Sequence, residues 1–177
     1  MSEFRKANSD DIYFVTFTVV GWIDVFTNKK YADIIVENLN FYIENQGIEV
    51  FTYVIMSNHL HIICRCAKGQ KLNSWLRNFK SYTARQLLKS IQNNCHDHRE
   101  MWMLRLFRKY ADKSSQNQDF MFWKKTSHPT KLFSNRVTNQ KINYIHNNPV
   151  KAGIVDEPYQ YVYSSANPSN PVRLTEW

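Results

Sequence analysis

The spacing of apolar residues in the first part of the chain predicts one helix among three strands. Positions 11–20 are dominated by β-branched and aromatic residues, which favours a central strand. Apolar residues at helical spacing predict a helix over 29–45. Two more strand patterns cover 48–56 and 59–65, and the two-residue step between them favours an antiparallel pair.

The predicted helix over 29–45 has a signal at each end. Asn28 can act as its N-cap, because an asparagine side chain accepts a hydrogen bond from a free backbone N–H of the first turn. Gly47 stands just after the helix, where a glycine commonly ends one. We therefore expect the helix boundaries to lie close to these two residues.

Three more elements are predicted after residue 68. One is a long amphipathic helix, whose apolar face consists of Leu72, Trp75, Leu76, Phe79, Thr83, Leu87 and Ile91. A short fourth strand is predicted at 120–123, after a polar stretch at 111–119 that favours a mobile loop. A last helix is expected over 131–148, where Pro149 prevents its simple continuation.

The order strand, helix, strand, strand, helix, strand is typical of a ferredoxin-like split βαβ fold. This α+β architecture has an antiparallel sheet with helices on one face, and it leaves the other face open for ligands. A length of 177 residues suits one domain, so we expect residues 1–177 to form a single domain with a core over about 11–166.

Composition and charge narrow the class of protein. The chain is 43% hydrophobic and 15% aromatic, which excludes a disordered protein, and its formal charge is +8. An anionic partner suits this excess, with nucleic acid as the first candidate and an anionic membrane surface as the second. Cys64, Cys66 and Cys95 give no disulfide framework, and no apolar run approaches the ~20 residues that span a bilayer. We therefore expect a cytoplasmic protein without a membrane segment.

Two histidines stand two positions apart in the third predicted strand. Side chains on a strand alternate between faces, so His59 and His61 should point the same way. Leu60 and Ile62 should then point into a core. Two neighbouring imidazoles can chelate one divalent cation or bind a phosphate. The alternative is a polar pair on a half-exposed strand, so the histidines serve a function only if they lie on the open face of the sheet.

The sequence contains two other sets of possible metal ligands. A zinc site would combine the histidine pair with Cys64 and Cys66, but a regular strand places these cysteines on the opposite face. A second set of possible ligands stands in a polar stretch and consists of Cys95, His96, Asp97 and His98. Histidines in polar loops usually bind nothing, so we expect neither set to hold a metal.

Basic residues decorate the long amphipathic helix. They are Lys71, Arg77, Lys80, Arg85 and Lys89. No acidic residue lies between positions 68 and 91. A basic helix face is often only a solvated face, but this uninterrupted run favours contacts with a phosphate backbone.

The last predicted helix brings three polar side chains to one strip. Tyr144 and Asn148 are four residues apart, so they lie one turn from each other on the same face. Lys141, three residues before Tyr144, borders that face. A helical tyrosine is more often part of a core or an interface, so this strip alone does not identify a site.

Two segments together resemble a known family. Residues 53–61, Tyr-Val-Ile-Met-Ser-Asn-His-Leu-His, resemble the histidine-hydrophobic-histidine signature of the HUH single-tyrosine transposases. Residues 144–153, Tyr-Ile-His-Asn-Asn-Pro-Val-Lys-Ala-Gly, are similar to the tyrosine-helix motif of the REP-associated tyrosine transposases, a subgroup of that family. Shorter similarities to the subgroup lie at Trp123, His128-Pro129 and 163–166. The resemblance extends over about 13–166.

The resemblance implies a metal-dependent transposase and endonuclease that nicks and rejoins single-stranded DNA and recognises DNA hairpins. Tyr144, on the last helix, would be the nucleophile and would form a 5′-phosphotyrosine intermediate. His59, His61 and Asn148 would hold Mg²⁺ or Mn²⁺. The best-known branch of the family commonly has glutamine at the third position, and Asn147 competes with Asn148 for this role.

DNA contacts are predicted from charge, and the possible assemblies follow from the resemblance. The basic residues that we expect to contact DNA are Arg77, Lys80, Arg85, Lys141 and Lys151. Aromatic residues would stack on unpaired bases, and the sequence does not tell which of them do so. Some relatives form a homodimer that exchanges tyrosine helices, whereas in the REP-associated group a single chain can supply the whole site.

Two other functions fit the sequence less well. A catalytically idle DNA-hairpin binding protein, such as a domesticated transposase, would share the fold, but all four expected polar residues of the active site are present. An unrelated phosphoesterase or nucleotidyl hydrolase would need a further histidine or a second histidine pair on a strand. His96 and His98 form a pair, but they stand in a polar region without a strand pattern.

Overall fold

The computed structural model of the protein describes residues 11–94, 97–113 and 119–177. A four-stranded antiparallel sheet lies at its centre, in the order β2-β3-β1-β4. Its strands are β1 (Tyr13–Thr18), β2 (Ile48–Ile55), β3 (His59–Cys66) and β4 (Thr130–Lys131). Because β1 lies between β3 and β4, as a split βαβ fold requires, the predicted α+β fold is confirmed.

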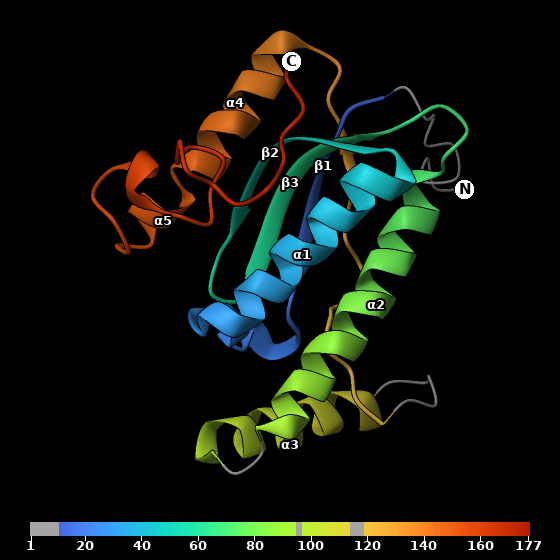
Figure 1. The fold of residues 1–177 in the computed structure, drawn as a ribbon, viewed down its shortest axis with the longest axis vertical. Coiled ribbons are helices and arrows are strands. Elements are labelled where there is room, and N and C mark those ends of the chain that lie inside the picture. The colour runs from blue at the N-terminus through green and yellow to red at the C-terminus, as the bar shows by residue number, and fades with distance from the viewer. Residues whose placement is uncertain (1–10, 95–96, 114–118) are drawn as a thin grey trace.

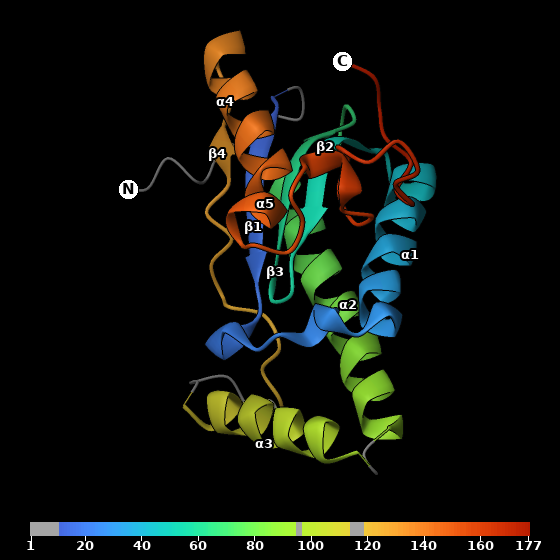
Figure 2. The ribbon, with the colours of Figure 1, turned by 90° about the vertical axis from the view of Figure 1, so that its left-hand side faces the viewer.

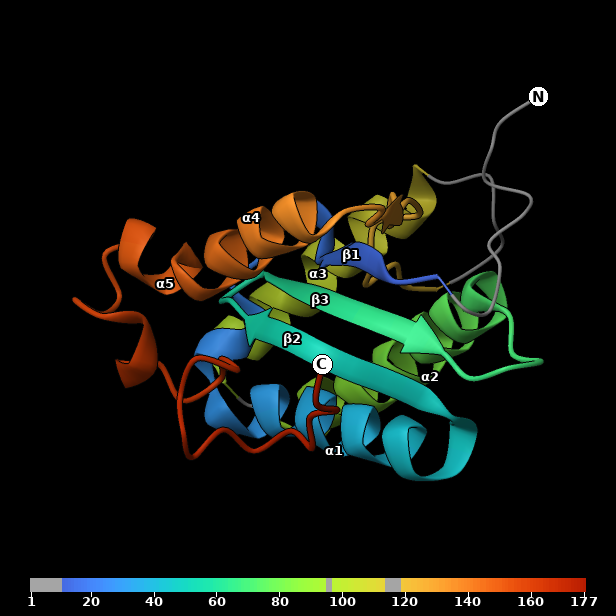
Figure 3. The ribbon, with the colours of Figure 1, turned by 90° about the horizontal axis from the view of Figure 1, so that it is seen from above.

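Helices lie on both faces of this sheet. They are α1 (Lys29–Gln46), α2 (Leu72–Asn93), α3 (His98–Asp112), α4 (Asn135–His146) and α5 (Asn148–Lys151). Short 3-10 turns lie at Val20–Trp22, Val25–Thr27 and Pro158–Gln160. Helices α1 and α2 cover one face, whereas α4 and α5 lie on the other (Figures 1 and 3). Helix α3 packs near the end of α2, away from α4 (Figure 2).

Both predicted ends of α1 are confirmed. The Asn28 side chain accepts a hydrogen bond from the backbone N–H of Lys30 at 3.0 Å, which satisfies a free donor of the first turn. Gly47 adopts the left-handed conformation after the helix, with a φ of 63°. A side chain there would also meet Ala67, because a Cβ would lie 2.9 Å from that residue's Cβ.

The predicted strand at 120–123 is wrong. Trp123 forms an isolated bridge with Val19, and the strand that pairs with this side of β1 is Thr130–Lys131. The Trp123 side chain is instead buried in the core, where its indole N–H donates to the Thr83 hydroxyl at 3.0 Å. The aromatic run thus contributes core packing, which a strand pattern does not distinguish from sheet pairing.

Two other boundaries differ from the prediction. The helix predicted over 131–148 begins later, at Asn135, because Ser134 caps it, and it breaks at Asn147 before α5. Of the predicted loop over 111–119, the first two positions belong to α3, and most of the rest lies outside the described residues. Helix α3 itself was not predicted, although its buried Met103, Phe107 and Ala111 repeat at four-residue spacing.

Apolar side chains form two clusters, one on each side of the sheet. The larger lies between the sheet and helices α1 and α2. The smaller consists of Phe14, Phe51, Val54, Met56, Ile63, Leu132 and Ile145. Since Ile145 belongs to α4, this helix covers part of the face that we expected to be open. The second face is therefore partly buried, and a site on it lies beside a helix.

Among the described residues, no helix has the length and apolar character needed to cross a membrane.

Candidate active site

The two histidines of β3 lie on the face that α4 covers. Their neighbours Leu60 and Ile62 are fully buried in the larger apolar cluster on the other side, as predicted. The imidazoles of His59 and His61 lie 4.7 Å apart, measured between ring centroids. Only 5% of His61 is exposed, and His59 is half-buried. The pair is therefore partly desolvated.

Tyr144 meets this pair from α4. Its hydroxyl lies 3.4 Å from Nε2 of His61, although 83 residues separate the two along the chain. Phe14 stacks on the His61 ring with centroids 5.2 Å apart and meets the Tyr144 ring edge-on. Tyr144 remains 41% exposed, so part of its side chain is open to a bound molecule.

Asn148 lies close to the same pair. It is the first residue of α5, and its side chain lies close enough to His59 to raise the pKa of that histidine. The Asn147 side chain instead donates to the carbonyl of Asn143 at 2.8 Å, one turn back in α4. Of the two asparagines that the sequence left in competition, Asn148 is therefore the one that interacts with His59.

A hydrogen bond at Nδ1 of each imidazole fixes the orientation of the ring. Thr16 Oγ1 lies 2.8 Å from Nδ1 of His61. Asn58 Oδ1 lies 2.8 Å from Nδ1 of His59. The Asn58 amide nitrogen donates to the Trp22 carbonyl and to the Asp24 carboxylate, at 3.3 and 2.7 Å. Its oxygen must then face His59, so Nδ1 of His59 carries the hydrogen and Nε2 keeps a lone pair.

Burial lowers the pKa of both histidines. For His61 the pKa falls to about 3, chiefly by desolvation, and the nearby His59 and Lys141 lower it further. Desolvation also lowers the pKa of His59, and the hydrogen bond to Asn148 opposes that shift in part. Both rings are therefore neutral near pH 7, which is the form of histidine that binds metal ions.

The donor set fits a divalent cation. Two neutral imidazole nitrogens and one amide oxygen would supply three ligands and leave coordination positions open. No group of three or more histidine, cysteine or acidic residues that could hold a metal exists among the described residues, so the set depends on an asparagine. Cys64 lies buried in the larger cluster on the opposite face, so the alternative zinc site with the cysteines does not form.

Two of the five predicted DNA-contacting residues flank the tyrosine. The Lys141 ammonium lies 5.6 Å from the centre of the Tyr144 ring, and the Lys151 ammonium lies 5.9 Å from it. Lys141 also lies 4.4 Å from the Phe14 ring centre. These two cations give the surface around Tyr144 a positive charge that would attract a phosphate group.

The other three lie on α2. Arg77 and Arg85 line a hollow of about 750 Å³ between α2 and residues 120–129. The Lys80 ammonium donates to the backbone carbonyls of Lys124 and Lys125, at 2.8 and 3.1 Å, and burial lowers its pKa to about 8. Lys80 thus holds the 120–129 segment against α2 and is already bound within the chain.

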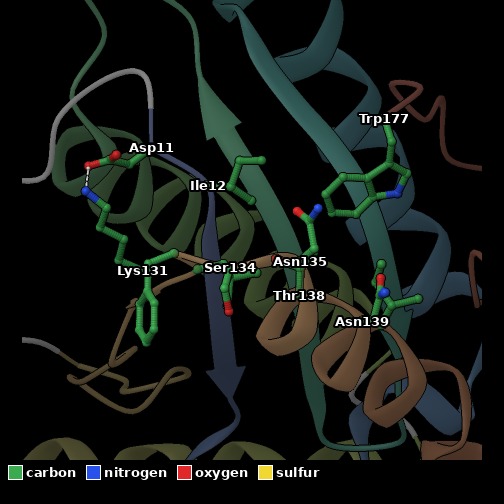
Figure 4. A pocket seen from close by; sticks show the side chains of 11 residues that line it. Asp11, Ile12, Lys131, Ser134, Asn135, Thr138, Asn139 and Trp177 are labelled. Carbon is green, nitrogen blue, oxygen red and sulfur yellow. Dashed lines mark ion pairs between the residues drawn. The ribbon is translucent and has the colours of Figure 1, made fainter.

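Another hollow of about 750 Å³ lies where α4 begins (Figure 4). Asn135, Thr138 and Trp177 are among its lining residues, and an ion pair between Lys131 and Asp11 lies beside them. His59, His61, Tyr144 and Asn148 do not line it.

Several residues of the site were not predicted. Thr16 is found only through the strand register, which pairs it with His61 across β1 and β3. Asn58 stands directly before His59, but nothing in the sequence tells where its amide points. Trp22 lies edge-on to His59, with ring centroids 5.7 Å apart. The Lys124 ammonium lies 4.3 Å from the centre of the Trp22 ring.

Comparison with known proteins shows which family and which solved structures this chain resembles. The model of the family described as "Transposase IS200 like" matches residues 13–119, which include the two histidines and end before Tyr144. The structure of a REP-associated tyrosine transposase bound to a REP hairpin superposes with a TM-score of 0.63 at 16% identity. That match covers 93% of this chain and 82% of the other.

A crystal structure from Deinococcus radiodurans R1, described as that of a transposase by similarity, gives a TM-score of 0.50 at 15% identity. The match covers 83% of this chain and 97% of the other. A comparison with curated proteins found no match. The two structural likenesses support the fold, and the family model supports the family.

Proposed function

Since the chain belongs to the family of IS200-like transposases, we propose that it nicks and rejoins single-stranded DNA through a covalent bond to Tyr144. The observation that carries this proposal is the 3.4 Å approach of the Tyr144 hydroxyl to Nε2 of His61. That contact joins the one tyrosine of the last-helix motif to the histidine pair within a single chain. A tyrosine that served only packing would have no need of this exposed position beside two neutral imidazoles.

The reaction is a transesterification at phosphorus. The Tyr144 oxygen forms a bond to the phosphorus of the scissile phosphate as the bond to the 3′ oxygen breaks. The phenol loses its proton, the leaving 3′ oxygen gains one, and the 5′ end stays on the tyrosine as a phosphodiester. Attack by another 3′-hydroxyl reverses the step and rejoins two strands, so the energy of the phosphodiester bond is conserved.

His59, His61 and Asn148 would hold Mg²⁺ or Mn²⁺. When bound, the cation would withdraw charge from the scissile phosphate and stabilise the leaving oxygen. Thr16 and Asn58 would keep the two imidazoles turned for this task, because each engages the Nδ1 side of its ring. Lys141 and Lys151 would bind the phosphate backbone on either side of the nucleophile.

We further propose that the substrate contains a DNA hairpin. Support comes from the related REP-associated tyrosine transposase, which was solved with a REP hairpin, and from this chain's formal charge of +8. Arg77 and Arg85 on α2 would bind phosphates at some distance from the cut. The alternative is a hairpin-binding protein without catalysis, and a covalent-adduct assay distinguishes it from the transesterase.

A covalent-adduct assay tests the proposal. The protein is mixed with labelled single-stranded oligonucleotides that form hairpins, together with Mg²⁺ or Mn²⁺, and run on a denaturing gel. We expect a labelled protein band that disappears with a chelator and in Tyr144→Phe. Tyr159→Phe is the matched control, because Tyr159 is also exposed, at 57%, and lies outside the site.

The other outcomes have distinct meanings. Tight hairpin binding with no adduct across a broad oligonucleotide library would support the binding protein without catalysis. Cleavage without an adduct that survives Tyr144→Phe would refute the tyrosine mechanism and favour hydrolysis that uses the histidine pair. The second histidine pair considered for a hydrolase is not assembled on a strand, since His98 begins α3 and His96 lies outside the described residues.

A further inference from the structure

Trp22 stands beside the histidine pair in an unusual backbone conformation. Its backbone φ is 55°, a value that residues other than glycine rarely adopt. The preceding Gly21 has a φ of 64°. A Cβ at Gly21 would lie 2.7 Å from the Tyr110 ring of α3. The Trp22 carbonyl accepts the hydrogen bond from Asn58. The turn is therefore held between α3 and the start of β3, and it keeps a large aromatic ring at one position.

The held ring is exposed to solvent. Trp22 is 53% exposed, so a bound molecule can reach its side chain. It meets His59 edge-on, and His59 in turn contacts His61, which contacts Tyr144. Four rings thus follow one another from the turn to the nucleophile. A strand of DNA whose phosphate lies at the histidines would pass close to Trp22.

Other exposed aromatic side chains lack this connection. In the described parts of the chain they include Phe41, Tyr82, Trp102, Phe133, Tyr159 and Trp177. Among the ring contacts found there, those to His59 or His61 come from Phe14, which is buried, and from Trp22 and Tyr144, which are exposed. Trp22 is thus the exposed aromatic ring, besides the nucleophile itself, that contacts the candidate site.

Lys124 adds a charge to the same spot. Its ammonium lies 4.3 Å from the centre of the Trp22 ring, and its backbone N–H donates to the carbonyl of Thr18 at 2.8 Å. Its carbonyl accepts from Lys80. The backbone of Lys124 is therefore anchored on both sides, and its side chain extends toward the indole. An aromatic ring with an adjacent ammonium matches a nucleotide, whose base stacks and whose phosphate is anionic.

We propose that Trp22 is the stacking platform for the unpaired nucleobase next to the phosphate that Tyr144 attacks, and that Lys124 binds a phosphate of the same nucleotide segment. The proposal rests on the proposed function, because it takes the scissile phosphate to lie at the histidine pair. Stacking on an indole accepts any base, so Trp22 would position the strand and leave base selection to other contacts.

A binding experiment tests the platform separately from catalysis. Tyr144→Phe protein is titrated into hairpin oligonucleotides in which 2-aminopurine replaces one unpaired nucleotide at a time. We expect the fluorescence of one such position to be quenched on binding, and the quenching to be lost in Trp22→Gly. Glycine suits a φ of 55°, so this variant removes the ring without straining the turn. Trp102→Ala is the control, since Trp102 on α3 is 51% exposed.

A second arm measures catalysis with an abasic nucleotide at the quenched position. Loss of stacking should slow adduct formation by about 5- to 150-fold, the equivalent of the usual value of one stacked base. Trp22→Gly should slow adduct formation by a similar factor on the intact strand. On the abasic strand it should slow adduct formation little further. Trp22→Phe should retain most of the activity, and Lys124→Gln should weaken binding mainly at low salt.

The two proposals fail in different ways. If wild-type protein forms no adduct but Trp22→Gly abolishes the quenching, Trp22 stacks on a base of the bound DNA, while the tyrosine chemistry and the position of that base beside a scissile phosphate are refuted. If adducts form and Trp22→Gly matches Trp102→Ala in quenching and rate, the platform is refuted while the transesterase stands. Quenching at a nucleotide remote from the mapped cut would also refute it, and so would the absence of any oligonucleotide binding.

Discussion

Asn58 links the turn that carries Trp22 to the imidazole of His59. Its oxygen faces Nδ1 of His59 at 2.8 Å, and its nitrogen donates to Asp24 at 2.7 Å. Such partners behind a metal-binding imidazole determine which nitrogen is free and how the ring is turned. A polar residue that never touches the substrate can therefore control the site.

We predict that Asn58→Ala raises the concentration of Mg²⁺ or Mn²⁺ needed for adduct formation by about 10- to 100-fold. The reason is that His59 loses the acceptor that keeps its Nε2 lone pair toward the site. The measurement is adduct formation as a function of metal concentration. Asn45→Ala is the control, because Asn45 is exposed and donates to a carbonyl of its own helix. An unchanged metal requirement in Asn58→Ala would refute the positioning role.

The buried His61 also predicts how stability depends on pH. Its pKa is about 3 in the folded chain and near 6.5 when the chain is unfolded, so between these values the unfolded state binds more protons. Stability should therefore be fully present above pH 6.5 and fall as the pH is lowered toward 3. This one group would cost about 2 kcal/mol by pH 5.

The measurement is the urea midpoint at several pH values in the presence of a chelator. His61→Asn should flatten the decline between pH 6.5 and 5, whatever its effect on stability at neutral pH. His128→Asn is the control, since His128 is exposed and its φ of 39° suits asparagine. Equal slopes in wild type and His61→Asn would contradict the prediction.

At the scale of elements, α4 brings the nucleophile to the sheet. Ile145, the residue after Tyr144, is fully buried in the smaller apolar cluster. Val137 and Ile142 pack against that cluster and are only partly buried. The position of Tyr144 therefore depends on few apolar contacts, and Ile145 is the strongest of them.

We predict that Ile145→Ala lowers the free energy of unfolding by about 2–5 kcal/mol and slows adduct formation at temperatures where the chain remains folded. The substitution leaves a cavity under α4 and loosens its contact with β2 and β3. Ile145→Val should cost only about 0.5–1.5 kcal/mol and keep most of the activity. Urea unfolding and adduct rates check both. Ile154→Ala, at an exposed position, should change neither.

The elements up to residue 93 could be predicted because each carries a complete periodic pattern with a cap or a turn at its end. The run at 120–123 could not, since buried aromatic residues look alike whether they pair in a sheet or only pack. The choice of Asn148 over Asn147 needed the structure for another reason. The helix breaks at Asn147, so counting 100° per residue no longer tells which side chain faces β3.

The site itself was predictable only in part. The alternation of β3 placed His59 and His61 on one face, and helical spacing placed Tyr144 near Asn148. The strand register that brings Thr16 to His61 and the turn that brings Trp22 to His59 depend on long-range packing. Lys80 was predicted from its charge alone, and the structure shows its ammonium bound to two backbone carbonyls.

At the scale of the whole molecule, one chain contains every residue of the candidate site. Helix α4 packs on β2 and β3 of its own sheet, and Tyr144 lies beside His61 of the same chain. A homodimer that exchanged tyrosine helices would combine Tyr144 of one chain with the histidines of the other. Because Tyr144 and His61 of the same chain already lie together, the site requires no exchange of helices.

Mixing two inactive variants distinguishes these arrangements. Tyr144→Phe lacks the nucleophile and His61→Ala lacks an imidazole, so a helix-exchanged dimer of the two would contain one intact site. A single-chain site would contain none. We therefore predict that the two variants, unfolded and refolded together, form no adduct above the level of each alone. Wild-type protein treated in the same way is the control for refolding. Recovery of adduct in the mixture, carried by the His61→Ala chain, would instead demonstrate exchange, because that chain alone retains Tyr144.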